Sequence, residues 1–390
     1  MSGTGTRDPQ RVTVLVFHGD HAATPVERLM AGGCAACALD TVELALACPL
    51  VDRVVVVTNS DALEAAAARH ERVAVDRDAP EEPFHFGRAL QAAIRKHDIA
   101  RPLYFGAAAA PLLSPATLED VCHRLLAADR TVVTNNAGSA DFFGFAPADA
   151  LGRIPLPATG DNSLPRLLTR QAGLKADVLP PAVETTFDVD TPTDLAILSV
   201  QTGVKHHAKR YVESHALGTD RLERAMPALI LRDTRKTLIG RVNTELWGTA
   251  ELGIRGPRRL YVEERAMQSY GRHTRGEVRS LLAELYAAVG AARFFSLLAE
   301  YSDVVLFDSR PLLYHLSPGL ARLPADRFRS DLGSADEIGD TVTREFTAAA
   351  LASPVPVILG GQNVVAGALW ALVQEAWDRA DAGLLAVQPD

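Results

Sequence analysis

The chain has 390 residues, which is long for one hydrophobic core, so two domains are expected. Apolar residues make up 47% of the sequence and charged residues 23%, a balance typical of globular proteins and not of disordered chains. The formal net charge of −8 provides no global basic field, so nucleic acid is not an expected partner.

The N-terminal residues MSGTGTRDPQR are polar and lead directly into the apolar run VTVLVF. This beginning lacks the hydrophobic region of a signal peptide. The longest apolar run, residues 354–373, approaches the roughly 20 residues of a membrane span, but its middle is interrupted at residues 360–363. We therefore expect a strand, a tight turn and a helix in this run, no membrane partner, and a cytoplasmic location.

The first half of the chain alternates β-rich runs with helical patterns, which predicts an α/β fold with a sheet covered by helices. The predicted strands are residues 12–17, 53–58, 73–75, 102–106, 131–135, 142–145 and 176–179. The predicted helices are residues 39–47, 62–69, 86–97, 115–127 and 163–171. Ser60, Asp61 and Ser114 stand where helix N-caps are expected.

The segment FDVDTPTDLAILSV begins at Phe187 and predicts a helix that starts at Thr191 and Pro192. Asp188 and Asp190 lie just before this helix. In an extended segment, residues two apart point to the same face, so both carboxylates are predicted to reach one site. The alternative is that one of them only caps the helix.

The order of these elements, with the motifs ACPLVDRVVVVTNS, PLLSPATLEDV and FDVDTPTDLAIL, resembles the MobA-like nucleotidyltransferases of the GT-A, nucleotide-diphospho-sugar transferase superfamily. The resemblance covers about residues 11–200. It implies a Rossmann-like GT-A domain with a mixed sheet that binds an NTP at the C-terminal ends of its strands. It also implies transfer of NMP to a small phosphorylated acceptor, with Mg²⁺ or Mn²⁺ held by acidic residues.

Carried onto this chain, the resemblance implies three sets of site residues. The implied catalytic residues are Asp190, Asp20 and Arg28; the implied nucleotide-binding residues are His18, Gly19, Gly87, Arg88 and Gly106; the implied metal ligands are Asp190 and Asp188. The chain departs from the family at Ala109, where a metal-binding aspartate is usual. Asp20 is the first candidate to replace that acid, and Asp141 is the second.

After a helical connector at residues 201–225, a second α/β domain with a smaller, mainly parallel sheet is predicted over residues 226–386. Its predicted strands are residues 228–233, 258–265, 303–310 and 354–361. In a parallel sheet, the polar residues after these strands would lie along one edge, where ligands bind. These residues are Arg232, Asp233, Glu263, Glu264, Asp308, Arg310, Gln362 and Asn363.

The Gly360-Gly361 turn is predicted to precede a helix, so its backbone N–H groups could approach an anion. We therefore expect a second-domain anion site. It would consist of Asp308, Arg310, Gly360, Gly361, Gln362 and Asn363. The alternative is a plain tight turn.

Three functions follow from the sequence. The first is a nucleotidyltransferase that uses an NTP and a small phosphorylated molecule. The second is a degenerate GT-A protein that binds a nucleotide or sugar nucleotide in a regulatory or scaffold role. In the third, the activity lies in the C-terminal domain. A homodimer is compatible with each of the three.

Overall fold

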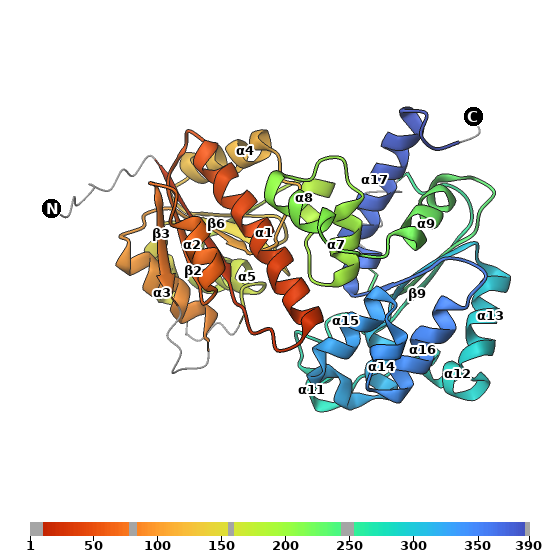
Figure 1. The fold of residues 1–390 in the computed structure, drawn as a ribbon. Helices are drawn as coiled ribbons and strands as arrows, with labels where there is room; N and C mark the ends of the chain where they lie inside the picture. The colour runs from red at the N-terminus through yellow and green to blue at the C-terminus, as the bar shows by residue number, and fades with distance from the viewer. Residues whose placement is uncertain (1–10, 78–83, 155–159, 243–252, 387–390) are drawn as a thin grey trace. The chain divides into compact units, whose positions relative to one another are not determined.

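The computed structural model describes residues 11–77, 84–154, 160–242 and 253–386 (Figure 1). The described residues form two compact units. The first unit takes in residues 11–21, 31–186 and 205–208, and the second takes in residues 22–30, 187–204 and 209 onward. The acidic segment before Thr191 thus belongs to the second unit, although a first domain of residues 11–200 was expected. The functions expected of the two domains stay predictions.

A seven-stranded sheet forms the centre of the first unit, with the order β3-β2-β1-β4-β6-β5-β7. Strand β6 is antiparallel to β4 and β5, and the other neighbouring pairs are parallel, which confirms the predicted mixed sheet. Each of the seven strands overlaps its predicted range. The strands are β1 (Val12–His18), β2 (Val51–Thr58), β3 (Val73–Arg77), β4 (Pro102–Gly106), β5 (Thr131–Thr134), β6 (Phe142–Ala146) and β7 (Lys175–Val178).

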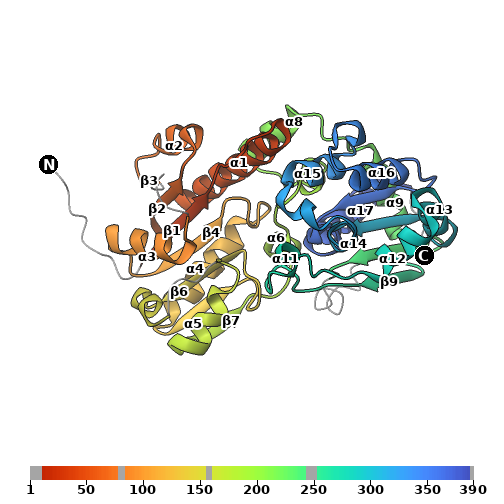
Figure 2. The same cartoon turned by 90° about the horizontal axis from the view of Figure 1, so that it is seen from below.

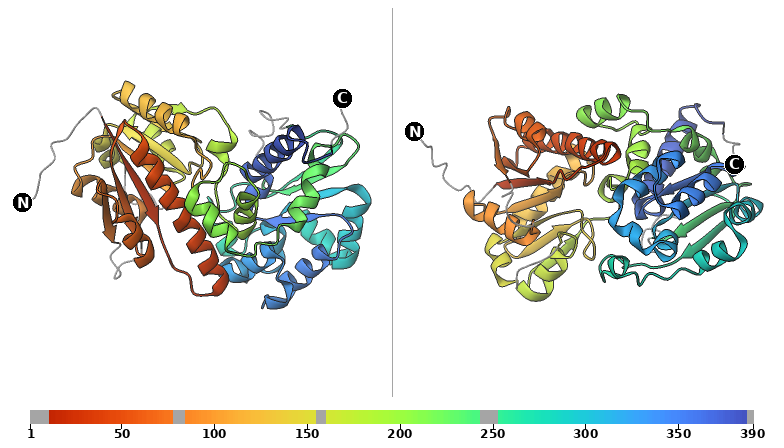
Figure 3. Two further views of the ribbon diagram at one scale, coloured as in Figure 1. Left: turned by 45° about the horizontal axis from the view of Figure 1, so that its top comes forward. Right: turned by 60° about the horizontal axis from the view of Figure 1, so that its bottom comes forward.

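Helices cover both faces of this sheet. Buried residues of α1 and α4 pack on one face with Val14 and Phe105, while α3 and α5 pack on the other with Leu15 and Tyr104. The long helix α1 is seen along its face of the sheet in Figure 3. The helices are α1 (Pro25–Ala47), α2 (Asp61–Ala67), α3 (Phe86–Lys96), α4 (Pro115–Ala127), α5 (Leu164–Ala172) and α6 (Val183–Thr186), with a 3-10 helix η1 (Ala148–Arg153).

Helix α1 begins fourteen residues before the predicted start at residue 39. Its N-terminus is a capping box, because Thr24 N donates to the Glu27 carboxylate at 2.8 Å and Glu27 N donates to Thr24 Oγ1 at 3.4 Å. The following residues, MAGGCAACA, are mostly small, so their helical periodicity is weak. Ser60 and Ser114 are N-caps as predicted, whereas Asp61 is the first residue of α2.

The second unit contains a four-stranded sheet, in which all neighbouring strands are parallel and the order is β11-β10-β8-β9. This arrangement confirms the predicted smaller parallel sheet. The strands are β8 (Lys236–Gly240), β9 (Arg258–Val262), β10 (Val304–Asp308) and β11 (Val357–Gly360).

Helices also cover the second sheet. The largest are α9 (Asp220–Ile230), α12 (Leu281–Val289), α13 (Ala291–Tyr301), α16 (Thr341–Leu351) and α17 (Gly367–Asp381). The shorter ones are α7 (Pro192–Ser199), α11 (Arg272–Arg275), α14 (Arg310–Leu316) and α15 (Pro324–Leu332), with the 3-10 helices η2 (Pro318–Arg322), η3 (Ala335–Glu337) and η4 (Gln362–Val365). Helix α8 (His206–Glu213) starts in the first unit and ends in the second.

The strand predicted at residues 228–233 is wrong. These residues form the end of α9 and the turn after it, and the strand begins only at Lys236. Leu222, Met226 and Leu229 are buried at helical spacing, so the apolar run ALIL completes a helical stripe. Arg232 and Asp233 consequently precede β8 and lie at the N-terminal edge of the sheet, opposite the edge predicted for them.

By length and composition, α1 is apolar enough to span a membrane, and so is the bent pair α12 and α13 if it is counted as one span. Half of the apolar window of α1 is buried within the protein. Core helices of globular proteins pass the same test, and residues 354–373 form the strand, turn and helix that were predicted.

Gly240 ends β8 with φ of +116°, a backbone conformation that favours glycine. A Cβ atom at this position would lie 2.5 Å from Asp308 Cβ and 2.8 Å from Asp308 O. We expect Gly240→Ala to lower the free energy of unfolding by about 3 kcal/mol, through backbone strain and overpacking. Urea denaturation followed by circular dichroism measures the loss.

Gly319→Ala is the matched control for this prediction. A Cβ atom at exposed Gly319 would meet nothing within 4 Å, so we expect a change of less than about 0.5 kcal/mol. Equal stabilities of the two variants would contradict the close approach of β8 and β10.

Candidate functional site

The first unit has a pocket of about 270 Å³ where β1 and β2 end. Loops at the C-terminal ends of parallel strands are the usual ligand sites of α/β sheets. We call this cavity the edge pocket. It is lined by Phe17, His18, Gly19, His21, Val57, Phe84, Phe86, Tyr104, Gly160 and Asp161.

Aromatic rings form the inner wall of the edge pocket. The ring of Tyr104 contacts those of Phe17 and Phe86 at centroid distances of 5.3 Å and 4.9 Å, edge to face. Phe17 and Phe86 are also in edge contact, at 5.8 Å. All three side chains are buried, whereas Phe84 is half exposed at the pocket. The wall therefore combines a rigid aromatic cluster with one accessible ring.

Two polar side chains meet at this wall. Tyr104 Oη donates a hydrogen bond to Asp161 Oδ2 at 2.7 Å. Burial raises the pKa of Tyr104 well above its usual value, and the negative charge of Asp161 adds to the shift. Tyr104 is therefore a neutral phenol at physiological pH. The second carboxylate oxygen of Asp161, Oδ1, accepts from Asn162 N at 2.8 Å.

His18 is a buried support for the loop after β1. Its Nε2 lies 3.2 Å from Ala31 O, and a carbonyl only accepts, so this nitrogen carries the proton. Thr58 Oγ1 then donates to Nδ1, also at 3.2 Å. Burial lowers the pKa of His18, so the imidazole is neutral near pH 7. His18 thus holds β1, β2 and α1 together, and it is not a cationic phosphate ligand.

The loop after His18 is anchored through the backbone of Asp20. Asp20 N donates to Asn59 Oδ1 at 2.6 Å, and Asn59 Nδ2 donates to Asp20 O at 2.9 Å. Gly19 directly precedes Asp20, and a Cβ atom on Gly19 would lie 3.4 Å from His21 Nε2. A larger side chain at residue 19 would therefore narrow the edge pocket.

The turn after β4 contains Ala109, at the position where the resemblance implies an aspartate. Ala109 is buried and packs in the same hydrophobic cluster as Phe105 and Leu113. Ala109 N donates to Gly106 O at 3.1 Å, so the turn is closed on itself. Gly106 N in turn donates to Asp141 O, at 3.2 Å. This corner of the sheet edge is therefore apolar and packed.

Asp141, the second candidate for the missing acid, also lies at this sheet edge. It precedes β6, which runs antiparallel to β4. Asn135 Nδ2 donates to Asp141 Oδ2 at 2.8 Å, and Asp141 N donates to Asn135 Oδ1 at 3.2 Å. These two bonds give Asp141 a structural role in joining the ends of β5 and β6.

The remaining predicted residues are divided between the units. Gly87 and Arg88 are in the first turn of α3, next to Phe86, with Gly87 buried and Arg88 exposed. Gly106 ends β4 close to Tyr104 Oη, so the first unit brings together His18, Gly19, Gly106 and the start of α3. Arg28, Asp188 and Asp190 are in the second unit, and Arg28 Nη1 donates to Ala23 O at 3.1 Å.

In the second unit, the acidic segment packs against the Gly-Gly turn after β11. Asn363 Nδ2 donates to both the backbone oxygen and Oδ1 of Asp188. Thr193 Oγ1 donates to Leu359 O at 2.6 Å, and a Cβ atom on Gly361 would lie 2.9 Å from Thr191 Cγ2. The turn predicted to receive an anion is thus occupied by the chain's own residues 188–193.

The alternation predicted for this segment agrees with its burial. Phe187 and Val189 are buried, Asp188 is partly buried and Asp190 is exposed. Neither aspartate is the helix cap, because Thr191 is the N-cap of α7 and forms a capping box with Asp194. Asp190 therefore presents its carboxylate outside the helix.

Asp194 was not predicted as a site residue, although it carries an unusual buried carboxylate. Its Oδ2 accepts from the N–H groups of Asp190 and Thr191 and from Thr191 Oγ1, while Oδ1 is buried with no hydrogen-bond partner. Burial, followed by the charge of Asp190, raises the pKa of Asp194 to about 8.

The charged residues at the C-terminal edge of the second sheet are paired with each other. The Arg241 guanidinium donates to both oxygens of Asp308, at 2.6 Å and 3.0 Å. Arg310 makes the same two-pronged contact with Asp331, and its Nη1 also donates to Gly360 O at 3.1 Å. All four side chains are buried, so the predicted anion site is a closed network in which each charge already has a partner.

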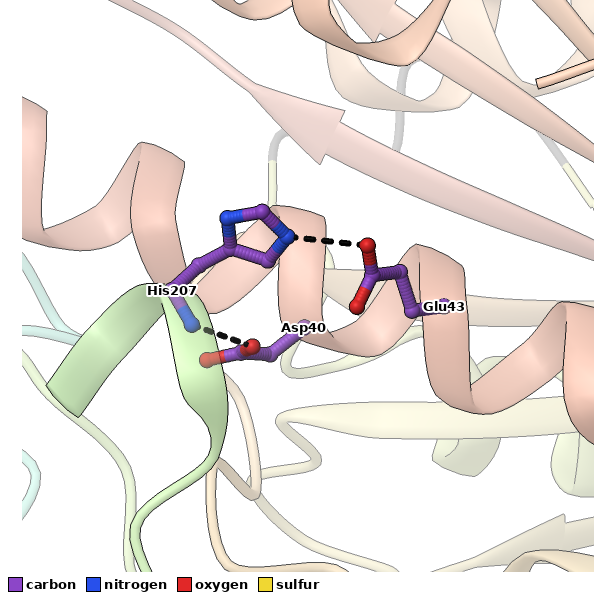
Figure 4. A group of neighbouring side chains, drawn as sticks. All are labelled: Asp40, Glu43 and His207. Carbon is purple, nitrogen blue, oxygen red and sulfur yellow. Dashed lines mark hydrogen bonds and ion pairs between the residues drawn. The ribbon is translucent and has the colours of Figure 1, made fainter. Parts of the chain in front are cut away.

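Among the described residues, one group of three side chains has ligand atoms close enough for a metal ion. Asp40, Glu43 and His207 place these atoms within 4.8 Å of one another (Figure 4). Both oxygens of Asp40 accept backbone N–H groups, from His207 and Ala208, at 2.8 Å. His207 Nε2 lies 3.0 Å from Glu43 Oε1. These bonds cap the N-terminus of α8, and they account for the cluster without an ion.

No family model and no curated protein sequence matches the chain. Solved structures match about half of it, including nucleotidyltransferases and cytidylyltransferases. A cytidylyltransferase from Leptospira borgpetersenii is similar at 13% identity and a TM-score of 0.39, over 53% of this chain and 93% of that chain. A nucleotidyl transferase from Methanothermobacter has 17% identity and a TM-score of 0.38, over 53% and 99%. The CMP:2-keto-3-deoxy-manno-octonic acid synthetase, in complex with CTP, has 14% identity and a TM-score of 0.33, over 47% and 95%.

The raised pKa of Asp194 predicts a pH dependence of stability. An unfolded aspartate titrates near pH 4, whereas Asp194 in the folded protein titrates at about 8. Between these values the folded state binds more protons, so this contribution to stability is present at about pH 4 and is lost as the pH rises through 8. We expect Asp194→Asn, which keeps an acceptor oxygen and does not titrate, to show a smaller fall in Tm than the wild type between pH 5 and pH 8.

Differential scanning calorimetry of both proteins in the same buffers measures this difference. Other titrating groups are shared by the two proteins and cancel in the comparison. Parallel Tm curves would contradict the burial of a protonated Asp194.

Proposed function

We propose that the first unit binds a nucleotide in the edge pocket. The observation that carries this proposal is the aromatic wall of Phe17, Phe86 and Tyr104 at the C-terminal ends of the strands. Aromatic side chains stack with nucleobases, and each such contact contributes about 1–3 kcal/mol to binding. The accessible ring of Phe84 provides the face for stacking, and the buried cluster behind it gives the pocket its shape.

The polar groups of the edge pocket suit the rest of a nucleotide. Asp161 can accept a hydrogen bond from a base amino group or a ribose hydroxyl. Gly19 and His21 line the same pocket. The backbone N–H groups of this loop and the imidazole N–H of His21 can donate hydrogen bonds to phosphate oxygens. Small ligand pockets commonly combine apolar walls with a few such placed polar groups.

The acids that the resemblance implies as metal ligands do not fit a Mg²⁺ site among the described residues. Asp188 is held by Asn363, Ala109 is packed in the core, and no group of three ligand atoms includes Asp188 or Asp190. A divalent ion with oxygen ligands needs several carboxylates, phosphates or waters around it. We therefore derive no step through a metal.

Nucleotidyl transfer to a small phosphorylated acceptor is the second proposal. The observation that favours it is Asp190, whose carboxylate is exposed just before α7. The first proposal requires only binding, and the second also requires release of pyrophosphate from an NTP. One set of assays therefore separates them.

A panel of ATP, GTP, CTP and UTP tests the binding proposal by thermal shift and calorimetry, in EDTA and in Mg²⁺. A ligand that binds only the folded state raises its apparent stability, so at least one nucleotide should raise Tm in EDTA. Gly19→Val places a branched side chain beside His21 and should weaken that binding at least tenfold.

Gly138→Val is the matched control, because exposed Gly138 lies outside the edge pocket and its variant should bind as the wild type does. Equal affinities of the Gly19 and Gly138 variants, or no Tm response to any nucleotide, would refute the pocket as the site. Mg²⁺-dependent pyrophosphate release that Asp190→Asn abolishes would establish transfer. Binding without release would leave the protein a nucleotide-binding relative of the fold.

A further inference from the structure

The two edge strands of the second sheet differ in whether other residues cover them against pairing with another chain. At one edge, β11 is covered by the start of α7, because Thr193 Oγ1 donates to Leu359 O. At the other edge lies β9, which has β8 on one side and no strand of the described structure on the other (Figure 2). Open sheet edges are pairing sites that proteins normally protect.

Strand β9 carries apolar residues that are exposed despite their place in a sheet. Leu260, Tyr261 and Val262 are 36%, 41% and 44% exposed, whereas every residue of the neighbouring β8 is buried. The strand contains no proline, and its register with β8 is continuous. The usual devices that block pairing at an edge, a proline, a bulge or an inward charge, are therefore missing from residues 260–262.

The exposed apolar surface continues onto the helices beside β9. Glu263 accepts from Leu281 N at 2.9 Å, so α12 begins next to the end of the strand, and the Leu281 side chain is 79% exposed. At the start of the strand, Arg259 Nη1 donates to Tyr301 O at 2.6 Å, and the half-exposed Tyr301 ring lies beneath its guanidinium. Exposed apolar side chains thus lie on residues 260–262 of β9 and on the helices near both of its ends.

The backbone groups of β9 alternate in direction between β8 and the open side of the strand. Lys236 N donates to Pro257 O at one end, and Glu263 N donates to Gly240 O at the other. Because hydrogen-bonding direction alternates along a strand, odd-numbered residues of β9 direct their backbone groups toward β8. The N–H and C=O groups of Leu260 and Val262 therefore point to the open edge.

The sequence of β9 is complementary to itself when it is read antiparallel. A two-fold axis at Tyr261 places Leu260 opposite Val262 and Arg259 opposite Glu263, so a basic side chain faces an acidic one on each side. Within each copy, Arg259 also donates to Tyr301 O, and the Glu263 carboxylate also accepts from the start of α12. Leu260 and Val262 then form the hydrogen-bonded pair, which agrees with the direction of their backbone groups. A parallel partner of the same sequence would instead place arginine beside arginine.

We propose that a second copy of this chain pairs with β9 in antiparallel orientation, with the two-fold axis at Tyr261. The two four-stranded sheets then join into one continuous sheet. The exposed residues Leu281 and Tyr301 extend the contact beyond the strands. Such an interface uses the same patch on both copies, as two-fold dimers do. The dimer does not depend on the nucleotide proposal.

Disulfide trapping in the full-length chain tests the position of the axis. Across a pair without direct hydrogen bonds, the Cβ atoms are about 4.5–5.5 Å apart, near the reach of a disulfide. Tyr261→Cys should therefore form a covalent dimer under mild oxidation, seen on a non-reducing gel and lost with reductant. Tyr270→Cys, at an exposed tyrosine outside β9, should stay monomeric on the same gel. Cross-linking of neither variant, or of both equally, would overturn the proposed axis.

Light scattering after gel filtration tests the interface without cross-linking. The wild type should elute with twice the 41.8 kDa mass of the chain. Val262→Pro removes a backbone donor that faces away from β8, and Leu260→Lys places two like charges near the axis; each should give the monomer mass. Leu384→Lys, at an exposed leucine after α17, is the control and should stay dimeric.

Circular dichroism checks that each variant is folded. Val262→Pro removes a backbone donor and Leu260→Lys adds a charge, so one folded variant of the two is enough to test the interface. A monomeric wild type at all concentrations would overturn the proposal. A dimer that survives Val262→Pro or Leu260→Lys would also overturn it, because the contact would then lie elsewhere.

Discussion

The hydrogen bonds between the acidic segment and the end of β11 determine how the site residues are distributed. Thr193 binds the Leu359 carbonyl, and Asn363 binds Asp188, so residues 187–204 fold with the second sheet. A motif expected to serve the first sheet is thereby committed to the second. The same contacts occupy the Gly-Gly turn and protect one edge of the sheet. The side chains that line the edge pocket all belong to the first unit.

Those side chains are mainly aromatic, with a carboxylate at Asp161 and imidazoles at His18 and His21, and no Lys or Arg is among the described residues that line the pocket. His18 is an uncharged support, and Tyr104 is a protonated phenol against Asp161. A pocket of this kind recognises a base by stacking and shape, and it gives a triphosphate little charge compensation. In the second unit, arginines are plentiful at the sheet edge, but Arg241 and Arg310 are neutralised by buried aspartates. These buried arginines therefore serve to hold the second sheet and its neighbouring helices in place.

Much of the fold could be predicted because short-range signals determined it. The β-branched runs around Val54 and Val133, and the caps Ser60 and Ser114, each define an element locally. The signals failed where local patterns conflicted. The small residues in the first half of α1 give it little helical periodicity, so this half was not predicted. The run ALIL is consistent with either a strand or a helix, and its burial on one face of α9 shows that it is helical.

The candidate site was harder to predict than the fold. Its wall joins a strand residue, Tyr104, with a helix residue, Phe86, and a carboxylate at Asp161 that is 57 positions away from its phenol partner. Each residue taken alone reads as ordinary core or loop, and only the tertiary fold brings them together. The pairing of Arg310 with Asp331 was equally hidden, because the two residues are 21 positions apart and Arg310 was predicted to belong to an anion site.

The alanine turn after β4 has a consequence for attempts to give this protein a metal. Ala109 is enclosed by hydrophobic neighbours, and Ala110 already has a positive φ of 48°. An aspartate introduced at residue 109 would be buried among apolar side chains. Burial would raise the pKa of its carboxyl group, so the protonated form, which does not bind a cation, would be favoured. Engineering catalysis here would require rebuilding the whole corner.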